Sequence, residues 1–299
     1  MEGKRGAIRI GISGWRYAPW RGVFYPKGLP QRRELEYASR ALSTIEVNGS
    51  FYSLRRPESY ALWHDQTPAH FVFSVKGPRF VTHILRLRAA EVALANFFAS
   101  GVANLRDKLG PFLWQLPPNF RYDADQIEAF LALLPRDADA AAALARRRND
   151  KVKGRARLVY GPTRPIRHAL EVRNTTFVTK SFITMLRRQR VALVIADTAG
   201  KWPEYEDITA DFAYVRLHGA DELYRSGYSE EALDRWGSRI LDWSHGREPP
   251  DAKKIATMRA RSAASRDVYC YFDNTDKMEA PRNAARLAEK LEVAWRSTE

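Results

Sequence analysis

Charged side chains occur in pairs at the ends of short apolar segments of the chain. Glu171 and Arg173 end one segment, and Arg216 and His218 end another. Residues two apart on a strand share a face, so each pair points to one side and the apolar residues beside it point to the other. Buried charges are costly unless they are paired, bound to a ligand or open to water, and such a group predicts a site for acid–base chemistry. The predicted catalytic residues are Glu46, Lys76, Glu171, Arg173, Arg216 and His218.

These residues suggest one scheme that needs no metal. Glu171 or Glu46 would be the general base and His218 the general acid. The three cations on the same rim would hold a carboxylate or phosphate of the substrate, which favours a small polar or anionic molecule. The cations are Lys76, Arg173 and Arg216.

A second scheme uses a divalent metal, the only candidate cofactor. Oxygen ligands with one imidazole suit Mn²⁺ or Mg²⁺, and less often Zn²⁺. Such an ion would polarise carbonyl and hydroxyl oxygens during proton abstraction. Arg173 and Arg216 count against it, because their guanidinium groups could neutralise the same carboxylates. The candidate ligands are Glu171, Asp197, His218 and Asp273.

Aromatic and amide side chains follow the same segments. Flat rings beside hydrogen-bonding groups suit a sugar ring or a nucleobase, although they could equally pack the first loops over the site. His83 and His168 are expected to be hydrogen-bonded residues outside the chemistry, and Cys270 an inert buried thiol. The predicted substrate-binding residues are Trp15, Asn48, Phe51, Tyr52, Gln115 and Asn274.

The elements that must position these residues are short strands that alternate with helix-sized stretches. This alternation predicts parallel βαβ units, and eight units in about 270 residues match a (β/α)₈ TIM barrel. An open doubly wound sheet is the alternative, but bulky Trp15 follows Gly14 where that fold needs a phosphate-binding turn. The predicted strands are Ile8–Ser13, Thr44–Asn48, Phe71–Lys76, Phe112–Leu116, Ala169–Arg173, Ala192–Asp197, Phe212–His218 and Val268–Asn274.

Five connections have helical patterns. The short stretch between Asp197 and Phe212 contains Gly200 and Pro203, which predicts a shortened or absent sixth helix. The stretches 134–169 and 219–268 are long insertions after strands 4 and 7. The predicted helices are Pro30–Leu42, Arg88–Leu109, Asp123–Leu134, Val178–Gln189 and Pro281–Trp295.

All the candidate site residues fall at the C-terminal ends of these strands, where TIM-barrel enzymes place their active sites. A second interpretation is a self-neutralising network that only specifies barrel closure. That network would set three acids against three cations, namely Glu46, Glu171 and Asp197 against Lys76, Arg173 and Arg216.

Composition excludes several protein classes. The chain has 299 residues, of which 45% are hydrophobic and 28% charged, as in globular proteins and unlike disordered or fibrous ones. We expect one TIM-barrel domain over residues 1–299. Cys270 is the single cysteine, so no intramolecular disulfide can form and we expect the cytoplasm. Apolar runs such as 191–196 are too short to span a membrane, and no secretory leader is expected.

The net charge of +14 is partly local. Nine basic residues and one acid lie between Arg146 and Arg167, in a predicted basic surface insertion over residues 138–167. Such a cluster could dock phosphates, so a nucleic-acid-binding or nuclease-like barrel is the alternative function. Aromatic residues for base stacking are scarce there apart from Tyr160, and a solvated surface is the simpler interpretation.

Seven motifs stand along the chain, GISGWRYAPWRGVFYP (11–26), EVNGSFY (46–52), FSVKGPRFVTHILRL (73–87), FLWQLPPNF (112–120), EVR (171–173), YVRLHG (214–219) and YFDNT (271–275). Together they resemble the YecE-like family of uncharacterised TIM barrels related to sugar isomerases. The resemblance runs from residue 8 to about 290 and implies a TIM barrel without an established reaction. The order acid, acid, imidazole, acid of the candidate metal ligands is similar to the metal site of sugar isomerases and epimerases, which suggests an isomerase- or epimerase-like enzyme, or a related lyase or hydrolase. Gly49 departs from the family pattern, where a small hydroxyl residue is expected.

Overall fold

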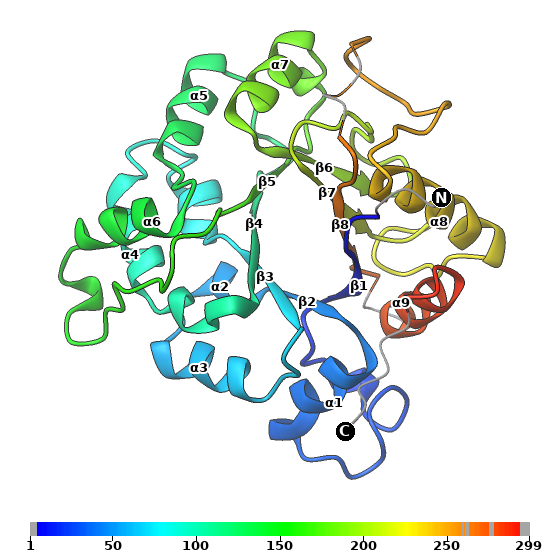
Figure 1. Ribbon diagram of the computed structural model, residues 1–299, viewed down its shortest axis with the longest axis horizontal. Helices are drawn as coiled ribbons and strands as arrows, with labels where there is room; N and C mark the ends of the chain where they lie inside the picture. The colour runs from blue at the N-terminus through cyan, green and yellow to red at the C-terminus, as the bar shows by residue number, and fades with distance from the viewer. Residues whose placement is uncertain (1–4, 259, 261–262, 275–277, 294–299) are drawn as a thin grey trace.

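A computed structural model gives the structure of the protein and describes residues 5–258, 260, 263–274 and 278–293. Eight parallel strands close into a barrel in chain order (Figure 1). This confirms the predicted TIM barrel, and every predicted strand is present with its ends shifted by at most three residues. The strands are β1 Ile8–Ser13, β2 Thr44–Val47, β3 Val72–Lys76, β4 Leu109–Gln115, β5 His168–Glu171, β6 Ala192–Asp197, β7 Phe212–Leu217 and β8 Asp267–Phe272.

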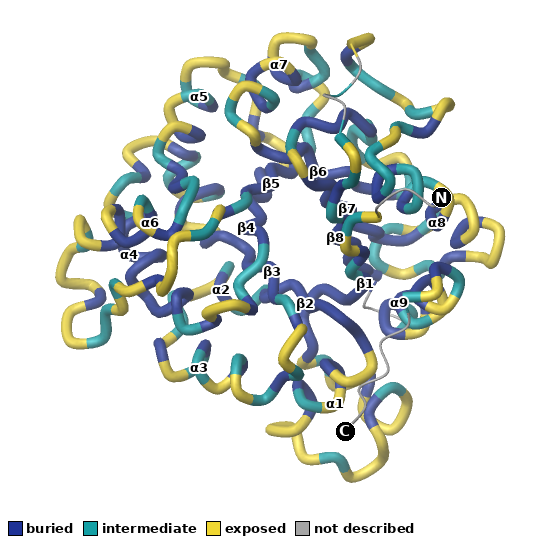
Figure 2. The backbone as a smooth tube through the Cα atoms, in the orientation of Figure 1, coloured by how far each residue is buried: buried dark blue, intermediate teal, exposed yellow. Residues whose placement is uncertain are grey.

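Helices surround the barrel, and their outer sides carry the exposed residues (Figure 2). The predicted absence of a sixth helix is confirmed, because no helix lies between β6 and β7. Short 3₁₀ or π turns occupy Ala18–Trp20, Gln31–Arg33, Phe80–Ile84, Val102–Lys108, Asp150–Val152 and Thr175–Phe177. The helices are α1 Glu34–Ala41, α2 Gly49–Tyr52, α3 Pro57–Asp65, α4 Glu91–Ala99, α5 Ala124–Leu133, α6 Ala138–Arg146, α7 Lys180–Gln189, α8 Glu230–Ser244 and α9 Glu279–Lys290.

Alternation along the strands separates two apolar layers. In β5, Ala169 lies in the small cluster inside the barrel, whereas Leu170 lies in the large cluster between barrel and helices. The same division holds in β7, where Tyr214 points inward and Val215 outward. The parity of each strand therefore decides which side chains reach the barrel axis.

Four of these helices, α2, α3, α6 and α8, are not among the predicted ones. α3 follows β2, and α8 lies inside the long stretch between β7 and β8. Ser229 caps α8 by accepting a hydrogen bond from the Ala232 backbone N–H at 3.2 Å. Trp236 and Trp243 bury its inner face. A capping residue followed by an amphipathic pattern is a sufficient physical reason for this helix.

The predicted basic insertion is partly built into the outer layer. α6 begins at its cap Asp137, which accepts from the Ala140 backbone N–H at 2.7 Å, and it packs against α4. Further along, Tyr160 is buried and donates to the Phe98 carbonyl at 2.5 Å. Five of its nine basic residues are exposed, and the other four are partly buried, namely Arg148, Arg155, Arg164 and Arg167. Among the described residues, no helix combines the length and the apolar character that a bilayer crossing needs.

Candidate active site

Arg216 is the centre of the charged cluster at the C-terminal mouth of the barrel. It projects inward from β7 and is completely buried. Its Nη2 donates to Glu46 Oε1 at 2.9 Å and to Asp273 Oδ2 at 2.8 Å, and its Nη1 donates to Glu171 Oε2 at 2.7 Å. Burial alone would lower the pKa of Arg216, but the three carboxylates outweigh it and hold the pKa above its usual value.

Glu46 at the end of β2 is saturated with hydrogen bonds. Oε1 accepts from Ser13 Oγ at 2.5 Å as well as from Arg216. Oε2 accepts from Tyr214 OH at 2.8 Å and from Arg216 Nε at 3.1 Å. A carboxylate with four donors has no remaining lone pair well placed for a substrate proton.

Glu171 and Arg173 extend the cluster at the end of β5. Arg173 Nε donates to Glu171 Oε1 at 2.6 Å, and its guanidinium carbon lies 3.9 Å from the centre of the Trp202 ring. Burial would raise the pKa of Glu171, yet the charges of Arg173 and Arg216 more than offset it and the pKa is well below its usual range. Glu171 is therefore ionised, and Arg173 is held between a carboxylate and a flat ring.

Lys76 at the end of β3 differs from the other cations. Its Nζ donates to Gln115 Oε1 at 2.7 Å and lies 4.5 Å from the centre of the Phe51 ring. No carboxylate of the described residues is in ion-pair contact with it. Burial and then the charge of Arg216 lower the pKa of Lys76 to about 8. At 9% exposure its amine is at the edge of the buried cluster.

His218 and Asp273 complete the mouth. His218 Nδ1 lies 3.1 Å from Asp273 Oδ2, and Nε2 lies 3.3 Å from Arg216 Nη1. Because Arg216 can only donate, Nε2 accepts and the ring proton sits on Nδ1, toward Asp273. Burial and then Arg216 lower the pKa of His218, so the imidazole is neutral at pH 7. The Asp273 side chain is 14% exposed and reaches the solvent side of the cluster.

His83 is a mouth residue that sequence reasoning placed outside the chemistry. It lies in the turn Phe80–Ile84, with its ring edge-on to Phe51 at 5.1 Å and its Nδ1 2.8 Å from Thr82 Oγ1. Burial and then the charge of Lys76 lower its pKa to about 4. Its position depends on an irregular turn, and no residue pattern signals that turn. His168 is buried as expected, accepting from Trp114 Nε1 at 3.1 Å and facing the Pro135 carbonyl at 2.7 Å.

The six residues predicted to be catalytic lie together at this mouth. Of the predicted substrate-binding residues, Phe51 and Gln115 contact Lys76, and Asn48 Nδ2 donates to Ser13 Oγ at 3.0 Å. Trp15 and Tyr52 line an adjoining cavity of about 330 Å³ together with Arg16, Arg55 and Trp63. Gly49 also borders this cavity, and a side chain there would come within 2.7 Å of Arg55 Nη2.

Asn274 is a wrong prediction. It points away from the barrel axis, where its Nδ2 donates to the Ser226 carbonyl and to Asn283 Oδ1, both at 2.9 Å. Asp273, one residue earlier, takes the inward direction. Asn274 therefore fastens the end of β8 to the outer layer. Thr275 of the YFDNT motif and Trp295 of the last predicted helix lie outside the described residues.

Asp197 is the second wrong prediction. Ala192, Val194 and Ala196 are the inward residues of β6, so Asp197 points outward. Its carboxyl group is hydrogen-bonded by Tyr228, by Trp236 and by the Ala199 backbone N–H. Burial raises its pKa.

This geometry does not fit the proposed metal ligands. Asp197 points outward from the barrel, whereas Glu171 and His218 point inward. Arg216 lies between the carboxylates of Glu171 and Asp273. Within the described residues, no three or more His, Cys, Asp or Glu side chains are grouped so as to hold an ion. A cation would have to displace the guanidinium group that neutralises its own donors.

The mouth as a whole is electrically balanced. Three cations face three carboxylates, so the pairing that holds the strand ends together leaves no formal excess. The pairs are Arg216 with Glu46, Glu171 and Asp273, and Arg173 with Glu171, while Lys76 remains beside Gln115. A network of this kind is rigid, and its edge presents an amine, a guanidinium and a carboxylate.

Comparisons with known proteins agree with the motifs. The model of a family described as "Protein of unknown function DUF72" matches residues 9–298. The "UPF0759 protein YecE" of Escherichia coli (strain K12) is 29% identical over 113 residues, which cover 38% of this chain and 39% of that protein. The chain thus matches less than half the length of this curated relative.

Solved structures resemble the whole chain. The crystal structure of a DUF72 family protein from Thermotoga maritima has a TM-score of 0.71 at 22% identity and covers 96% of this chain and 99% of that one. One from Enterococcus faecalis has a TM-score of 0.69 at 16% identity and covers 96% of both chains. At such identities the likeness concerns the fold.

Proposed function

We propose that this chain, which belongs to the DUF72 family of proteins of unknown function, is an enzyme that removes and returns a proton on a small anionic polar substrate. The reaction would take place at the C-terminal mouth of the barrel. The observation that carries the proposal is the placement of Lys76, a lysine at the edge of a charge-balanced cluster with an amide and an aromatic ring as its neighbours.

Lys76 is the general base in this proposal, in place of Glu46 or Glu171. A lysine with a pKa of about 8 is partly neutral near pH 8 and can accept a proton. Both oxygens of Glu46 and both of Glu171 already accept from donors in the cluster. Carboxylates whose oxygens are occupied in this way suit ion pairing better than proton abstraction, and the lowered pKa of Glu171 adds to this.

Arg173 is the group that would bind the anionic end of the substrate. Its Nε is used by Glu171 and its face by Trp202, so the guanidinium group is fixed in orientation. Among the described residues its two Nη groups make no hydrogen bond. Two parallel N–H groups match a carboxylate or a phosphate.

Asp273 would hold a hydroxyl group of the substrate. Its partly exposed carboxylate is ionised, because Arg216 and the contact with His218 overcome the effect of burial and hold its pKa below the usual range. An ionised carboxylate is a strong acceptor for a sugar-like hydroxyl. His218 would act as a positioning residue that orients Asp273, since its ring is fully buried.

The chemical step follows from these roles. The neutral Lys76 amine takes a proton from a carbon next to a carbonyl group, so that the C–H bond breaks and an N–H bond forms. The electron pair moves to the carbonyl oxygen and gives an enolate. Return of the proton from the Lys76 ammonium to the same carbon completes an epimerisation. Its return to the former carbonyl carbon completes an isomerisation, in which the hydroxyl proton of the deprotonated carbon passes to the former carbonyl oxygen and the new carbonyl group forms at the deprotonated carbon. A sugar acid or sugar phosphate with a carbonyl group has all the features that this step needs.

Proton exchange provides the test, because it needs no knowledge of the product. The protein is incubated in D₂O with a panel of sugar acids, sugar phosphates and 2-oxo acids, and ¹H NMR follows the loss of C–H signals. Wild type is expected to exchange one class of substrate. Lys76→Met should slow the exchange by about 100-fold or more, the range expected for removal of a general base.

The matched control is Lys180→Met, which removes an exposed lysine at the start of α7 and should leave the exchange rate unchanged. Dialysis against EDTA should also leave it unchanged. Exchange that persists in Lys76→Met, or that depends on added Mn²⁺, would contradict the proposal.

A further inference from the structure

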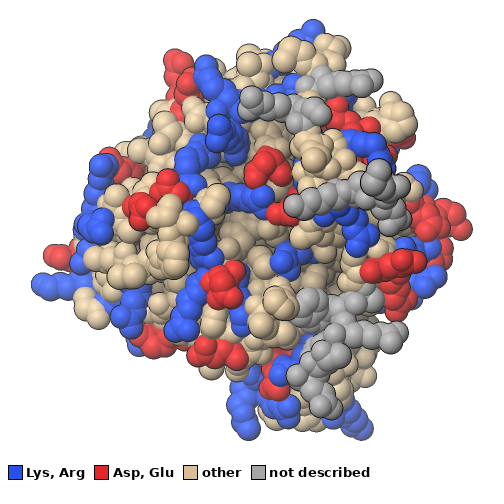
Figure 3. Space-filling model, viewed as in Figure 1, with Lys and Arg blue, Asp and Glu red and all other residues tan. Residues whose placement is uncertain are grey.

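A large cleft lies at the opposite end of the barrel from the mouth. It has a volume of about 920 Å³ and is bordered by the residues just before β5, β6, β7 and β8. The strands run clockwise from β1 to β8 in Figure 1, so with right-handed crossovers the view is onto their amino-terminal ends. The cleft therefore opens on the face seen in Figure 3, where Lys and Arg side chains, together with some Asp and Glu side chains, lie around a central hollow.

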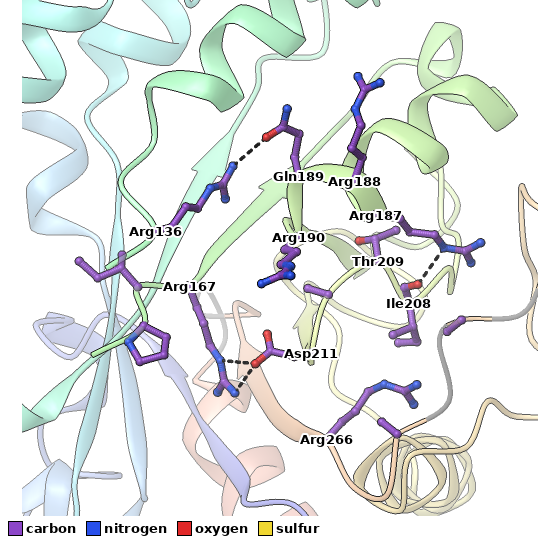
Figure 4. Close-up of a pocket in the computed structure, with 15 residues that line it drawn as sticks. Arg136, Arg167, Arg187, Arg188, Gln189, Arg190, Ile208, Thr209, Asp211 and Arg266 are labelled. Atoms are coloured by element: carbon purple, nitrogen blue, oxygen red, sulfur yellow. Dashed lines mark hydrogen bonds and ion pairs between the residues drawn. The ribbon is translucent and has the colours of Figure 1, made fainter. Parts of the chain in front are cut away.

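The lining of this cleft is strongly basic. Six arginines and a single acid, Asp211, line it, and Figure 4 shows these arginines coming from several connections, with the Arg188 side chain directed away from the shared space toward its partner Glu128. A concentration of positive charge in a concave surface attracts anions more strongly than the same charges on a convex surface. The arginines are Arg136, Arg167, Arg187, Arg188, Arg190 and Arg266.

Two of these arginines lack an acidic partner in the described part of the chain. Arg167 is neutralised by Asp211 at 2.8 Å and by Asp267 at 2.6 Å. Within the described residues, Arg136 bonds only to the Leu131 carbonyl and to Gln189, and the Arg190 side chain has no hydrogen-bond or ion-pair partner. Arg136 and Arg190 thus supply guanidinium donors that no carboxylate occupies.

The two charges also act on each other. Burial and then the nearby charge of Arg190 lower the pKa of Arg136. Arginine stays protonated in proteins, so the repulsion is a cost of the unliganded cleft. An anion between the two guanidinium groups would remove that cost.

We infer that this amino-terminal cleft is a binding site for a compact polyanion that carries several phosphate groups. The volume is within the range of small-molecule sites. Planar guanidinium groups match phosphate oxygens with pairs of N–H donors. The described residues of the lining include no aromatic side chain on which a nucleobase could stack, so the charges rather than the bases of a ligand would be recognised.

Isothermal titration calorimetry with sodium tripolyphosphate tests this inference. Wild type should bind one tripolyphosphate per chain at about 150 mM NaCl, where exposed charges are screened. Arg136→Gln with Arg190→Asn should weaken binding by about tenfold or more, because charge-assisted hydrogen bonds are lost. Asn is chosen because Arg190 has a φ of 50°, a backbone region that asparagine tolerates. Arg190→Asn alone serves as the second variant if the double variant is unstable.

The control removes the same charge elsewhere. Arg146→Ser with Lys153→Ser changes two exposed residues of the basic insertion and should alter the affinity by less than about twofold, as expected for screened surface charges. Failure of wild type to bind, or equal loss in both double variants, would overturn the inference. It would also be overturned if a single-stranded oligonucleotide bound more tightly than tripolyphosphate and lost affinity only with the insertion variant.

Discussion

At the level of single residues, the mouth depends on Arg216. Its five N–H donors let one side chain contact three carboxylates at once. Arg216 is fully buried and pairs with Glu46, Glu171 and Asp273. Removing one member of such a network leaves charges that have lost both water and partner. The cluster is therefore both a support for the strand ends and the framework on which Lys76 and Arg173 are held.

Arg216→Met should destabilise the fold. We expect the free energy of unfolding at pH 7 to fall by about 3–5 kcal/mol, because three buried carboxylates lose their shared cation. Urea denaturation measures the change. Arg282→Met, which breaks an exposed pair with Glu279 on α9, should cost less than about 1 kcal/mol. Equal losses in the two variants would show that Arg216 is not the centre of the network.

Alternation along strands predicted most of the mouth residues. It works in β2, β5 and β7 because polar and apolar residues alternate there, so the polar ones identify the inward face. β6 gives no such signal, because Ala192–Ala196 is apolar on both faces. Asp197 was assigned inward from its charge alone. His83 could not be placed, because an irregular turn has no residue period.

At the level of secondary structure, the strand ends carry two kinds of polar side chain. Some point into the barrel mouth, and others point outward and bind the surrounding layer. Asp197 ties the end of β6 to Tyr228 and to Trp236 of α8, and Asn274 ties the end of β8 to Ser226 and Asn283. These contacts hold the long connection between β7 and β8 against the barrel. The sequence predicted eight strands but not α8, because Gly237 and Ser238 weaken the helical pattern in the middle of that stretch.

Asp197→Ala should distinguish a structural role of this residue from a catalytic one. Loss of the acceptor for Tyr228 and Trp236 should lower the free energy of unfolding by about 1–3 kcal/mol, measured by urea denaturation. The rate of deuterium exchange into substrate should stay unchanged in the folded variant, because the residue lies outside the mouth. Loss of exchange with unaltered stability would show that Asp197 takes part in the chemistry, as its prediction as a metal ligand implied.

At the level of the whole molecule, the two ends of the barrel have different electrostatics. The C-terminal mouth pairs its charges almost completely, whereas the amino-terminal cleft leaves arginines without acids among the described residues. Much of the +14 net charge is therefore separate from the proposed chemistry. The barrel architecture was predictable from strand count and length, but this cleft was not, because its arginines come from distant parts of the chain.

The buried histidines and carboxylates predict how stability depends on pH. His168 has a pKa lowered to about 3 by burial, and the pKa of His218 is lowered as well. Each unfolded histidine binds its proton near pH 6.5, so stability is complete above that pH and falls as the solution is acidified. Glu171 and Asp273, whose folded pKa values are also lowered, add a further loss below about pH 4.5.

Urea denaturation at several pH values measures this dependence. Between pH 7 and pH 5 we expect a loss of more than about 1 kcal/mol in the free energy of unfolding. His168→Gln should reduce the slope in that range. A free energy of unfolding that stayed constant from pH 7 to pH 5 would be inconsistent with two neutral buried imidazoles.

Titration of Lys76 tests the central idea most directly, because a lysine base at an anion-binding mouth must have both a lowered pKa and a response to anions. NMR of protein labelled with ¹³C at the lysine ε-carbons, with the signal assigned by its absence in Lys76→Met, gives the pKa. We expect about 8 in the free protein and an increase when lactate is added, since a bound carboxylate near the amine favours the ammonium form. A Lys76 pKa at the ordinary lysine value, unmoved by lactate, would contradict the account.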